Sequence, residues 1–176
     1  MDLTSSPLVV MGVSGSGKSL VGSMLARAFQ RAFVDGNALH SPASLAKMSS
    51  GCALDDDDRA PWLDAVAERL SREDAVLACS ALRRAYRDRI RHIVPGAVFV
   101  QLSAEPRLIA ERLAARSGHF MPAALLDSQL TAFEPLEADE RGATVDVSGA
   151  PDAVVASALA KLLSAKRPRH SDAAPE

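Results

Sequence analysis

A glycine-rich segment at residues 12–19 constrains the fold of this chain more than any other feature. It reads Gly-Val-Ser-Gly-Ser-Gly-Lys-Ser, which matches the pattern G-x-x-x-x-G-K-[ST] in full. The apolar run Leu8–Met11 precedes it, and an amphipathic stretch from Lys18 to about Phe29 follows. Glycines let the backbone wrap a phosphate with its N–H groups, and the helix behind presents free amides and its positive dipole end to the same anion. The segment therefore predicts a phosphate-binding loop, rather than a turn that merely joins a strand to a helix.

The loop also predicts which residues bind a nucleoside triphosphate. Lys18 is expected to reach the β and γ phosphates, and the Ser19 hydroxyl to join the shell of a Mg²⁺ ion. The predicted nucleotide-binding residues are Gly12, Val13, Ser14, Gly15, Ser16, Gly17, Lys18 and Ser19.

Apolar runs alternate with helical patterns along the whole chain, as in consecutive β-α-β units. Strands are expected at 8–11, 32–34, 75–79, 97–102 and 144–147. Helices are expected at 18–29, from about 59, and at 83–93, 105–116, 123–133 and 152–163. Five short β runs separated by helices predict an α/β fold of three layers, α/β/α, around a parallel sheet.

Length and composition indicate one folded domain. A chain of 176 residues buries more than about two-thirds of its unfolded surface, and 48% hydrophobic with 24% charged residues is the balance of a globular protein. We expect a single domain at residues 1–165. Residues 166–176 lack periodicity and are expected to form a disordered tail, whose few basic residues are solvated rather than bound to nucleic acid.

The overall charge and the apolar pattern bear on partners and location. A formal net charge of -2 provides no electrostatic footprint for nucleic acid or an anionic membrane. Cys52 and Cys79 are the only cysteines, and their spacing suits neither a metal site nor a disulfide framework. The first residues lack a signal-peptide pattern, and no apolar run approaches the roughly 20 residues of a membrane helix. We therefore expect a cytoplasmic protein.

A phosphate-binding loop does not say what receives the phosphate, so the rest of the chain must narrow the class. A regulatory GTPase would need the guanine-reading motif N-K-x-D, which the sequence lacks. The D-x-x-G pattern at residues 146–149 follows the last predicted strand, and we interpret it as the turn that ends this strand. The chain is also too short for the additions of most ATP-driven machines. A small-molecule kinase with a late, arginine-containing lid remains.

Six blocks of sequence occur in an order that is typical of one kinase family. They read M-G-V-S-G-S-G-K-S (11–19), D-G-N-A-L-H (35–40), K-M-S-S-G (47–51), D-D-D-R-A-P-W-L (56–63), C-S-A-L-R-R-A-Y-R-D (79–88) and R-L-A-A-R-S-G-H-F (112–120). In these blocks the chain resembles the gluconate kinases (gluconokinases) of the shikimate-kinase-like group, almost continuously from Met11 to near Leu163. Shikimate kinase proper fits less well, because nowhere do three glycines adjoin.

The resemblance implies a reaction and leaves alternatives open. It implies ATP as phosphoryl donor, Mg²⁺ as cofactor, D-gluconate as acceptor, 6-phospho-D-gluconate as product, and a homodimer. A kinase of another sugar acid or polyol, and an ATP-binding module with impaired catalysis, are the alternatives. A nucleotide or nucleoside kinase is disfavoured, because the resemblance covers the acceptor segments as well as the loop.

The block at residues 35–40 carries acceptor-side candidates. Asp35 ends the second strand at the carboxyl edge of the sheet, where open α/β folds bind ligands. The resemblance assigns it to the Mg²⁺ shell through water or to orienting the acceptor hydroxyl, rather than to a helix cap. Gluconate kinases usually have Asp where this chain has Asn37, and general-base catalysis typically contributes 10² to 10⁴-fold. Phosphoryl transfer depends mostly on positioning, so we expect activity to survive with Asn37 as a substrate contact. His40 resembles the family histidine that faces the sugar acid.

Arginines supply the remaining acceptor candidates. A planar guanidinium suits a carboxylate, and the resemblance places Arg59 beside the acceptor. Ser80 and Arg83, where the third strand gives way to a helix, are candidate substrate contacts, and Gln129 is another by resemblance. The acidic run at residues 55–58 is interpreted as a helix cap rather than a metal site. Trp62 and Cys79 are interpreted as core packing residues. The arginines at 84, 87 and 89 are interpreted as a solvated helix face.

Arg112 and Arg116 are four residues apart, hence on one helix face, and a turn follows them. We interpret them as catalytic lid arginines that neutralise charge on the transferring phosphoryl group, a contribution of 10³ to 10⁵-fold in systems with an arginine finger. The alternative is two solvated helix arginines.

Overall fold

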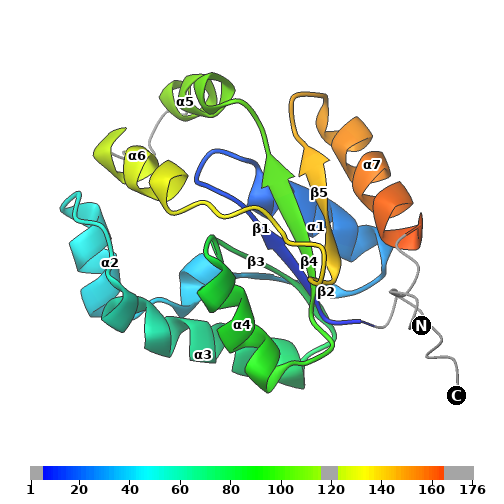
Figure 1. Cartoon of the computed structure of the whole chain (residues 1–176), viewed down its shortest axis with the longest axis horizontal. Coiled ribbons are helices and arrows are strands. Elements are labelled where there is room, and N and C mark those ends of the chain that lie inside the picture. The colour runs from blue at the N-terminus through cyan, green and yellow to red at the C-terminus, as the bar shows by residue number, and fades with distance from the viewer. Residues whose placement is uncertain (1–5, 116–122, 165–176) are drawn as a thin grey trace, which may run out of the picture.

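A parallel sheet of five strands forms the centre of the domain in the computed structural model, which describes residues 6–115 and 123–164 (Figure 1). The strand order is β2-β3-β1-β4-β5, and every neighbouring pair is parallel. The strands are β1 (Leu8–Met11), β2 (Ala32–Asp35), β3 (Ala75–Cys79), β4 (Val98–Ser103) and β5 (Gly142–Asp146). The predicted five-stranded α/β fold is confirmed.

Helices cover both faces of the sheet, and the side chains of β1 show why. Leu8 and Val10 point into a core shared with α1 (Lys18–Ala28) and α7 (Pro151–Ser164). Val9 and Met11, one residue out of phase, point into a second core shared with α3 (Asp56–Arg72) and α4 (Arg84–Ile93). Because successive side chains of a strand point to opposite faces, a continuous apolar run predicts a strand buried on both sides.

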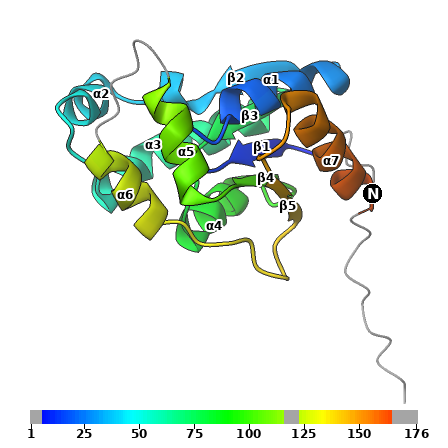
Figure 2. The same ribbon diagram turned by 90° about the horizontal axis from the view of Figure 1, so that it is seen from above.

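The other helices lie outside the two helical layers that cover the faces of the sheet. They are the short 3-10 helix η2 (Gly36–Leu39), α2 (Pro42–Ser49), α5 (Pro106–Ala114) and α6 (Ala123–Thr131). Figure 2 shows α2, α5 and α6 gathered on one side of the domain and α7 on the other. Helices α2, α5 and α6 lie around the end of the sheet where the phosphate-binding loop leaves β1 (Figures 1 and 2).

Two helices between β2 and α3 were not among the expected elements. Helix α2 begins with Pro42 at its first turn, and the Ser41 hydroxyl caps it by accepting from the Ser44 amide. At eight residues the helix is too short for hydrophobic periodicity to reveal it. Helix α3 begins at Asp56, three residues before the predicted start, because Asp55 and Asp58 form a reciprocal capping box. The helix-cap interpretation of the acidic run is confirmed.

The interpretation of Arg87 as a solvated side chain is wrong. Its side chain is fully buried, and its Nε and Nη2 donate to the two carboxylate oxygens of Glu140 at 2.7 and 2.6 Å. The guanidinium also donates to the backbone carbonyls of Leu82, Glu134 and Pro135. The pair therefore attaches α4 to the segment that leads into β5. Arg89 remains exposed and Arg84 is half-buried, and both pair with nearby carboxylates.

Glu140 is held ionised by this arrangement. Burial acts to raise its pKa, but hydrogen bonds from Arg87, from the Glu137 backbone amide and from Arg91 outweigh burial and lower the pKa to about 2. Donors arranged in this way favour the anionic form of the carboxylate.

Within residues 6–115 and 123–164, no helix has the length and apolar character that crossing a membrane requires. Cys79 is buried in the second core, as expected. The predicted tail at 166–176 lies outside the described residues.

Candidate active site

The phosphate-binding loop connects β1 to α1 in a conformation that only glycine adopts readily. Gly15 and Gly17 have φ angles of 83° and 90°, in the left-handed region. Gly12 has φ 151°, and a Cβ atom there would lie 2.8 Å from the Leu102 carbonyl oxygen and from the Ser16 hydroxyl. All three loop glycines therefore have positive φ angles that favour glycine, and at Gly12 the neighbouring atoms also leave no room for a side chain.

Polar groups inside the loop fit an anionic ligand. Within the described part of the chain, the buried Ser16 hydroxyl has no hydrogen-bond partner, although buried polar groups normally have one. The Lys18 ammonium donates to the Val13 carbonyl oxygen at 3.0 Å, which curls this side chain back over the loop. Gly17 is the N-cap of α1, so the free amides of the first turn open onto the same site.

The two predicted metal ligands are in direct contact. The Ser19 hydroxyl donates to Asp35 Oδ2 at 2.7 Å, while Asp35 Oδ1 accepts from the backbone amide of Asn37 at 3.0 Å. Asp35 thus caps η2 and also faces the loop. Mg²⁺ usually takes one or two protein oxygens and completes its shell with water and substrate phosphates. The Ser19 and Asp35 oxygens fit that pattern.

A cavity of about 320 Å³ lies between the loop, the first turn of α1, Arg112 of α5 and the start of α7. Its polar side consists of residues 15–17 of the loop and Arg112, whose Nη2 donates to the Val147 carbonyl oxygen at 2.6 Å. Its apolar side consists of Leu20, Val21 and Val154. Apolar walls beside a phosphate-binding loop suit a nucleotide base and ribose. Arg116, the other predicted lid arginine, lies outside the described residues.

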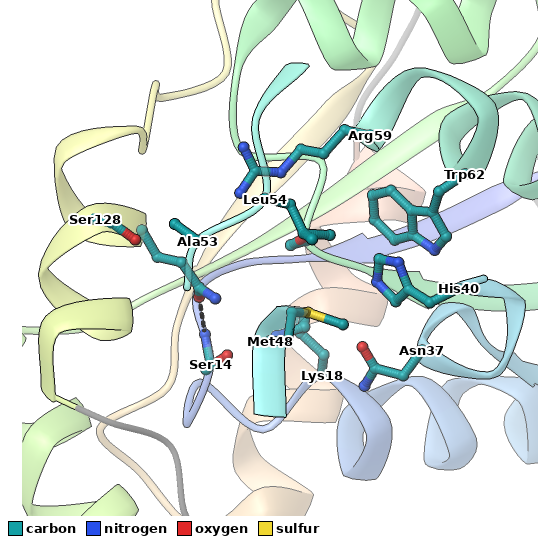
Figure 3. A pocket seen from close by; sticks show the side chains of 12 residues that line it. Ser14, Lys18, Asn37, His40, Met48, Ala53, Leu54, Arg59, Trp62 and Ser128 are labelled. Atoms are coloured by element: carbon teal, nitrogen blue, oxygen red, sulfur yellow. Dashed lines mark hydrogen bonds between the residues drawn. The ribbon is translucent and has the colours of Figure 1, made fainter. Parts of the chain in front are cut away.

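A second, polar cavity of about 90 Å³ lies between the loop, η2, α3 and α6 (Figure 3). Five of the six predicted substrate contacts line it together with Lys18. They are Asn37, His40, Arg59, Ser80 and Gln129. Segments far apart in the sequence therefore meet here, as the prediction required. We refer to this space as the polar cavity.

The charge of the polar cavity is one-sided. Lys18 and Arg59 contribute two cations, and no Asp or Glu side chain stands among its described lining residues. Figure 3 shows the two cations on opposite sides of the space, with Met48 and Leu54 between them. A small anionic ligand suits this electrostatic environment.

His40 forms one wall of the polar cavity. Its ring stacks on that of Trp62 with a centroid distance of 4.5 Å and an interplanar angle of 7°. Trp62 is itself held by a hydrogen bond of 2.8 Å from its indole N–H to the Gly36 carbonyl oxygen. Burial, and secondarily the Arg59 charge, lowers the pKa of His40 below its ordinary value. The imidazole is therefore neutral at pH 7 and retains a nitrogen that accepts a hydrogen bond.

Trp62 is a core residue, as predicted. It is only 4% exposed and packs in the core between the sheet and α3. It is also among the residues that line the polar cavity (Figure 3).

Arg83 is the one predicted acceptor contact that the structure does not bring into the polar cavity. Its Nη1 instead pairs with Asp56 at 3.1 Å, at the start of α3. The guanidinium lies 5.7 Å from the centroid of the Tyr86 ring.

Two contacts at the site were missed or barely visible in the sequence. The Ser14 backbone amide of the loop donates to Gln129 Oε1 of α6 at 2.7 Å, drawn in Figure 3. In the sequence, only the family resemblance points to Gln129. The second contact is the hydrogen bond from Arg59 to the Tyr86 hydroxyl. The sequence analysis assigns no function to Tyr86, although this residue lies inside a matched block and is the only tyrosine of the chain.

Known proteins are similar to this chain in both sequence and fold. The family model described as an AAA domain matches residues 8–136. The chain is 44% identical over 153 residues to a gluconokinase of Gluconobacter oxydans, covering 84% of this chain and 86% of the relative. It is 40% identical over 157 residues to the thermoresistant gluconokinase of Escherichia coli, covering 86% and 90%.

Solved structures lead to the same family. A gluconokinase from Sinorhizobium meliloti superposes with a TM-score of 0.85 at 48% identity, covering 91% of this chain and 93% of that one. A shikimate kinase from Acinetobacter baumannii superposes with a TM-score of 0.59 at 18% identity, which shows a common fold alone. The family predicted from the six sequence blocks is confirmed. By identity and coverage alike, the chain belongs to the gluconokinase family.

Proposed function

We propose that this chain transfers the γ-phosphoryl group of ATP to D-gluconate, releasing ADP and 6-phospho-D-gluconate. Membership of the gluconokinase family supports this activity. The observation in the structure that carries it is the polar cavity, which adjoins the phosphate-binding loop and has two cations and no carboxylate among its described lining residues. A polyhydroxylated monoanion is the kind of acceptor that such a space accommodates.

On the nucleotide side, the loop amides and Lys18 bind the triphosphate. Lys18 compensates the negative charge that gathers on the phosphoryl oxygens. Ser19 and Asp35 would hold Mg²⁺, which when bound would supply further neutralisation of the phosphate charge. The base and ribose occupy the cavity of about 320 Å³ beside Leu20 and Val154.

On the acceptor side, Arg59 binds the gluconate carboxylate, while Asn37, His40 and Ser80 form hydrogen bonds with its hydroxyl groups. A neutral His40 accepts a hydrogen bond from a hydroxyl without repelling Arg59. Asp35 lies two residues before Asn37, and its carboxylate already accepts hydrogen bonds from the Ser19 hydroxyl and the Asn37 backbone amide. Positioning and charge neutralisation therefore provide most of the catalysis.

Arg112 is proposed to act on the transferring phosphoryl group from the α5 side. Arg112 shares its cavity with the loop residues Gly15 and Gly17, which brings a guanidinium to the phosphate region. The role of Arg116, the homodimer, the domain boundary at residue 165 and the cytoplasmic location stay predictions.

A coupled assay of ADP release over a panel of acceptors tests the proposal. D-gluconate is expected to give the highest kcat/KM among sugar acids and polyols. A higher value for another acceptor would reassign the substrate. Binding of Mg²⁺-ATP without turnover of any acceptor would identify a module with impaired catalysis.

Asn37→Asp tests whether the chain lacks a base that it needs. We expect kcat on gluconate to change by less than about tenfold, because phosphoryl transfer depends little on general-base catalysis. Steady-state kcat and KM are measured for both proteins, with Asn37→Ala as the matched control, which should lose the amide contact and raise KM about tenfold. An increase in kcat of about a hundredfold or more would show that the natural chain is impaired on gluconate.

A further inference from the structure

Arg59 is a cation of the polar cavity whose charge is not already paired. In the stretches 6–115 and 123–164, no carboxylate oxygen lies within 4.0 Å of its guanidinium nitrogens, whereas Arg83, Arg84, Arg87 and Arg89 all have such partners. An unpaired guanidinium is available to a ligand carboxylate. Its long side chain, however, must be held in place to bind that carboxylate in one geometry.

Tyr86 of α4 provides this restraint. The Tyr86 hydroxyl accepts a hydrogen bond from Arg59 Nη1 at 3.2 Å, and the Arg59 guanidinium carbon lies 5.6 Å from the centroid of the Tyr86 ring. The ring is fixed in turn, since Tyr86 is 7% exposed and packs in the core between the sheet and α3. A rigid phenol therefore contacts the guanidinium through both its hydroxyl and its face.

Asp56 completes the arrangement from the first turn of α3. The Tyr86 hydroxyl donates to Asp56 Oδ1, and both Asp56 oxygens accept from Arg83 Nη1. Asp56 thereby neutralises Arg83 and leaves the charge of Arg59 to the cavity. Burial, and then the hydrogen bond to Asp56, raises the pKa of Tyr86, so the phenol remains a donor to Asp56 at neutral pH.

We propose that Tyr86, held by Asp56, is a positioning residue that orients Arg59 toward the carboxylate of the acceptor. The proposal rests on the proposed function and adds how the acceptor's charged end is recognised. Tyr86 itself touches no reacting atom. Its contribution appears in acceptor affinity and not in the phosphoryl-transfer step.

Tyr86→Phe tests this role, because it keeps the ring and removes only the hydroxyl. We expect KM for gluconate to rise about tenfold, with kcat changed by less than about threefold and KM for ATP unchanged. Trp62 is the only tryptophan and lines the polar cavity, so quenching of its fluorescence gives the gluconate Kd without turnover. That Kd should rise by the same factor.

A double-mutant cycle with Arg59→Ala shows whether Tyr86 acts through the arginine. Once Arg59 is removed, Tyr86→Phe should have no further effect on gluconate affinity. D-glucitol, a polyol without a carboxylate, should bind wild type and Tyr86→Phe equally. Arg89→Gln, on the same helix but paired with Asp64 at the surface, is the control and should leave both constants unchanged.

The outcomes separate this inference from the proposed function. Normal turnover of gluconate by wild type, with additive effects in the cycle or an equal loss for D-glucitol, would overturn the role of Tyr86 alone. A wild-type protein that neither binds nor phosphorylates gluconate would overturn the proposed function, and this inference with it. Should Tyr86→Phe fail to fold, Asp56→Asn, which weakens the same contact at the exposed end, must raise the gluconate Kd in the same way or the inference is wrong.

Discussion

Lys18→Met is expected to lower kcat for gluconate phosphorylation by about a thousandfold, a loss of about 4 kcal/mol in transition-state stabilisation. Methionine keeps most of the length and apolar stem of lysine and removes the charge. The ammonium that now donates to the Val13 carbonyl oxygen belongs to the loop whose glycines wrap the phosphates. Its charge matters most when negative charge redistributes among the phosphoryl oxygens.

The measurement is kcat by ADP release at saturating gluconate and ATP, with the melting temperature recorded to show that the variant folds. Lys161→Met is the matched control, since Lys161 lies on α7 and donates only to the Thr144 carbonyl oxygen at 2.6 Å among the described residues. The control should keep the wild-type kcat. A Lys18→Met enzyme with kcat within tenfold of wild type would mean that the loop does not act on the transferred phosphoryl group.

Glu140→Gln is expected to destabilise the fold by about 3–5 kcal/mol, because it leaves the guanidinium of Arg87 buried without its counter-charge. Both side chains of this pair are fully buried, so water cannot replace the lost carboxylate. For a chain of this size the melting temperature should fall by about 10 °C. Chemical denaturation followed by circular dichroism gives the free energy of unfolding.

Asp64→Asn is the control for this prediction. The Arg89–Asp64 pair has a similar bidentate geometry, but its side chains are 45% and 38% exposed, so its loss should change stability by less than about 1 kcal/mol. A similar loss in both variants would show that burial does not distinguish the two pairs.

The Glu140 effect should also depend on pH. Its pKa is about 2 in the folded protein and about 4.5 when unfolded, so the pair contributes fully above about pH 4.5. That contribution is lost as the pH falls from about 4.5 toward 2. The stability difference between wild type and Glu140→Gln should therefore be largest near neutral pH and shrink over this acid range.

Some features of the fold could be predicted because their causes are local. The strand from Ala75 to Cys79 was placed to the residue, since an apolar run bounded by polar residues needs no distant partner to be recognised. The cap formed by Asp55 and Asp58 was equally visible, because both groups lie within one helical turn. The eight-residue helix α2 was missed, since too few residues repeat for a period to appear.

The acceptor-side prediction depended on the family resemblance. Nothing local to Asn37, His40, Arg59 or Ser80 says that they share a cavity, and the matched blocks supplied that link. The same blocks included Arg83, whose side chain the structure pairs with Asp56 instead. A block match places a residue near a site but does not choose its side-chain partner.

The amino-acid sequence by itself determined the phosphate-binding loop, the alternation of strands and helices, and the family. The loop and the alternation depend on spacing and periodicity within short segments, and the family was inferred from the resemblance of six sequence blocks. Only the tertiary structure decided that Arg87 is buried, since its carboxylate partner lies 53 residues away. It likewise decided that Gln129 bonds the Ser14 amide across 115 residues, and that Tyr86 holds Arg59. The physical reason is that the burial and pairing of a polar side chain depend on which segments the sheet brings together, and an arginine on a helix looks the same in the sequence whether it faces water or a buried glutamate.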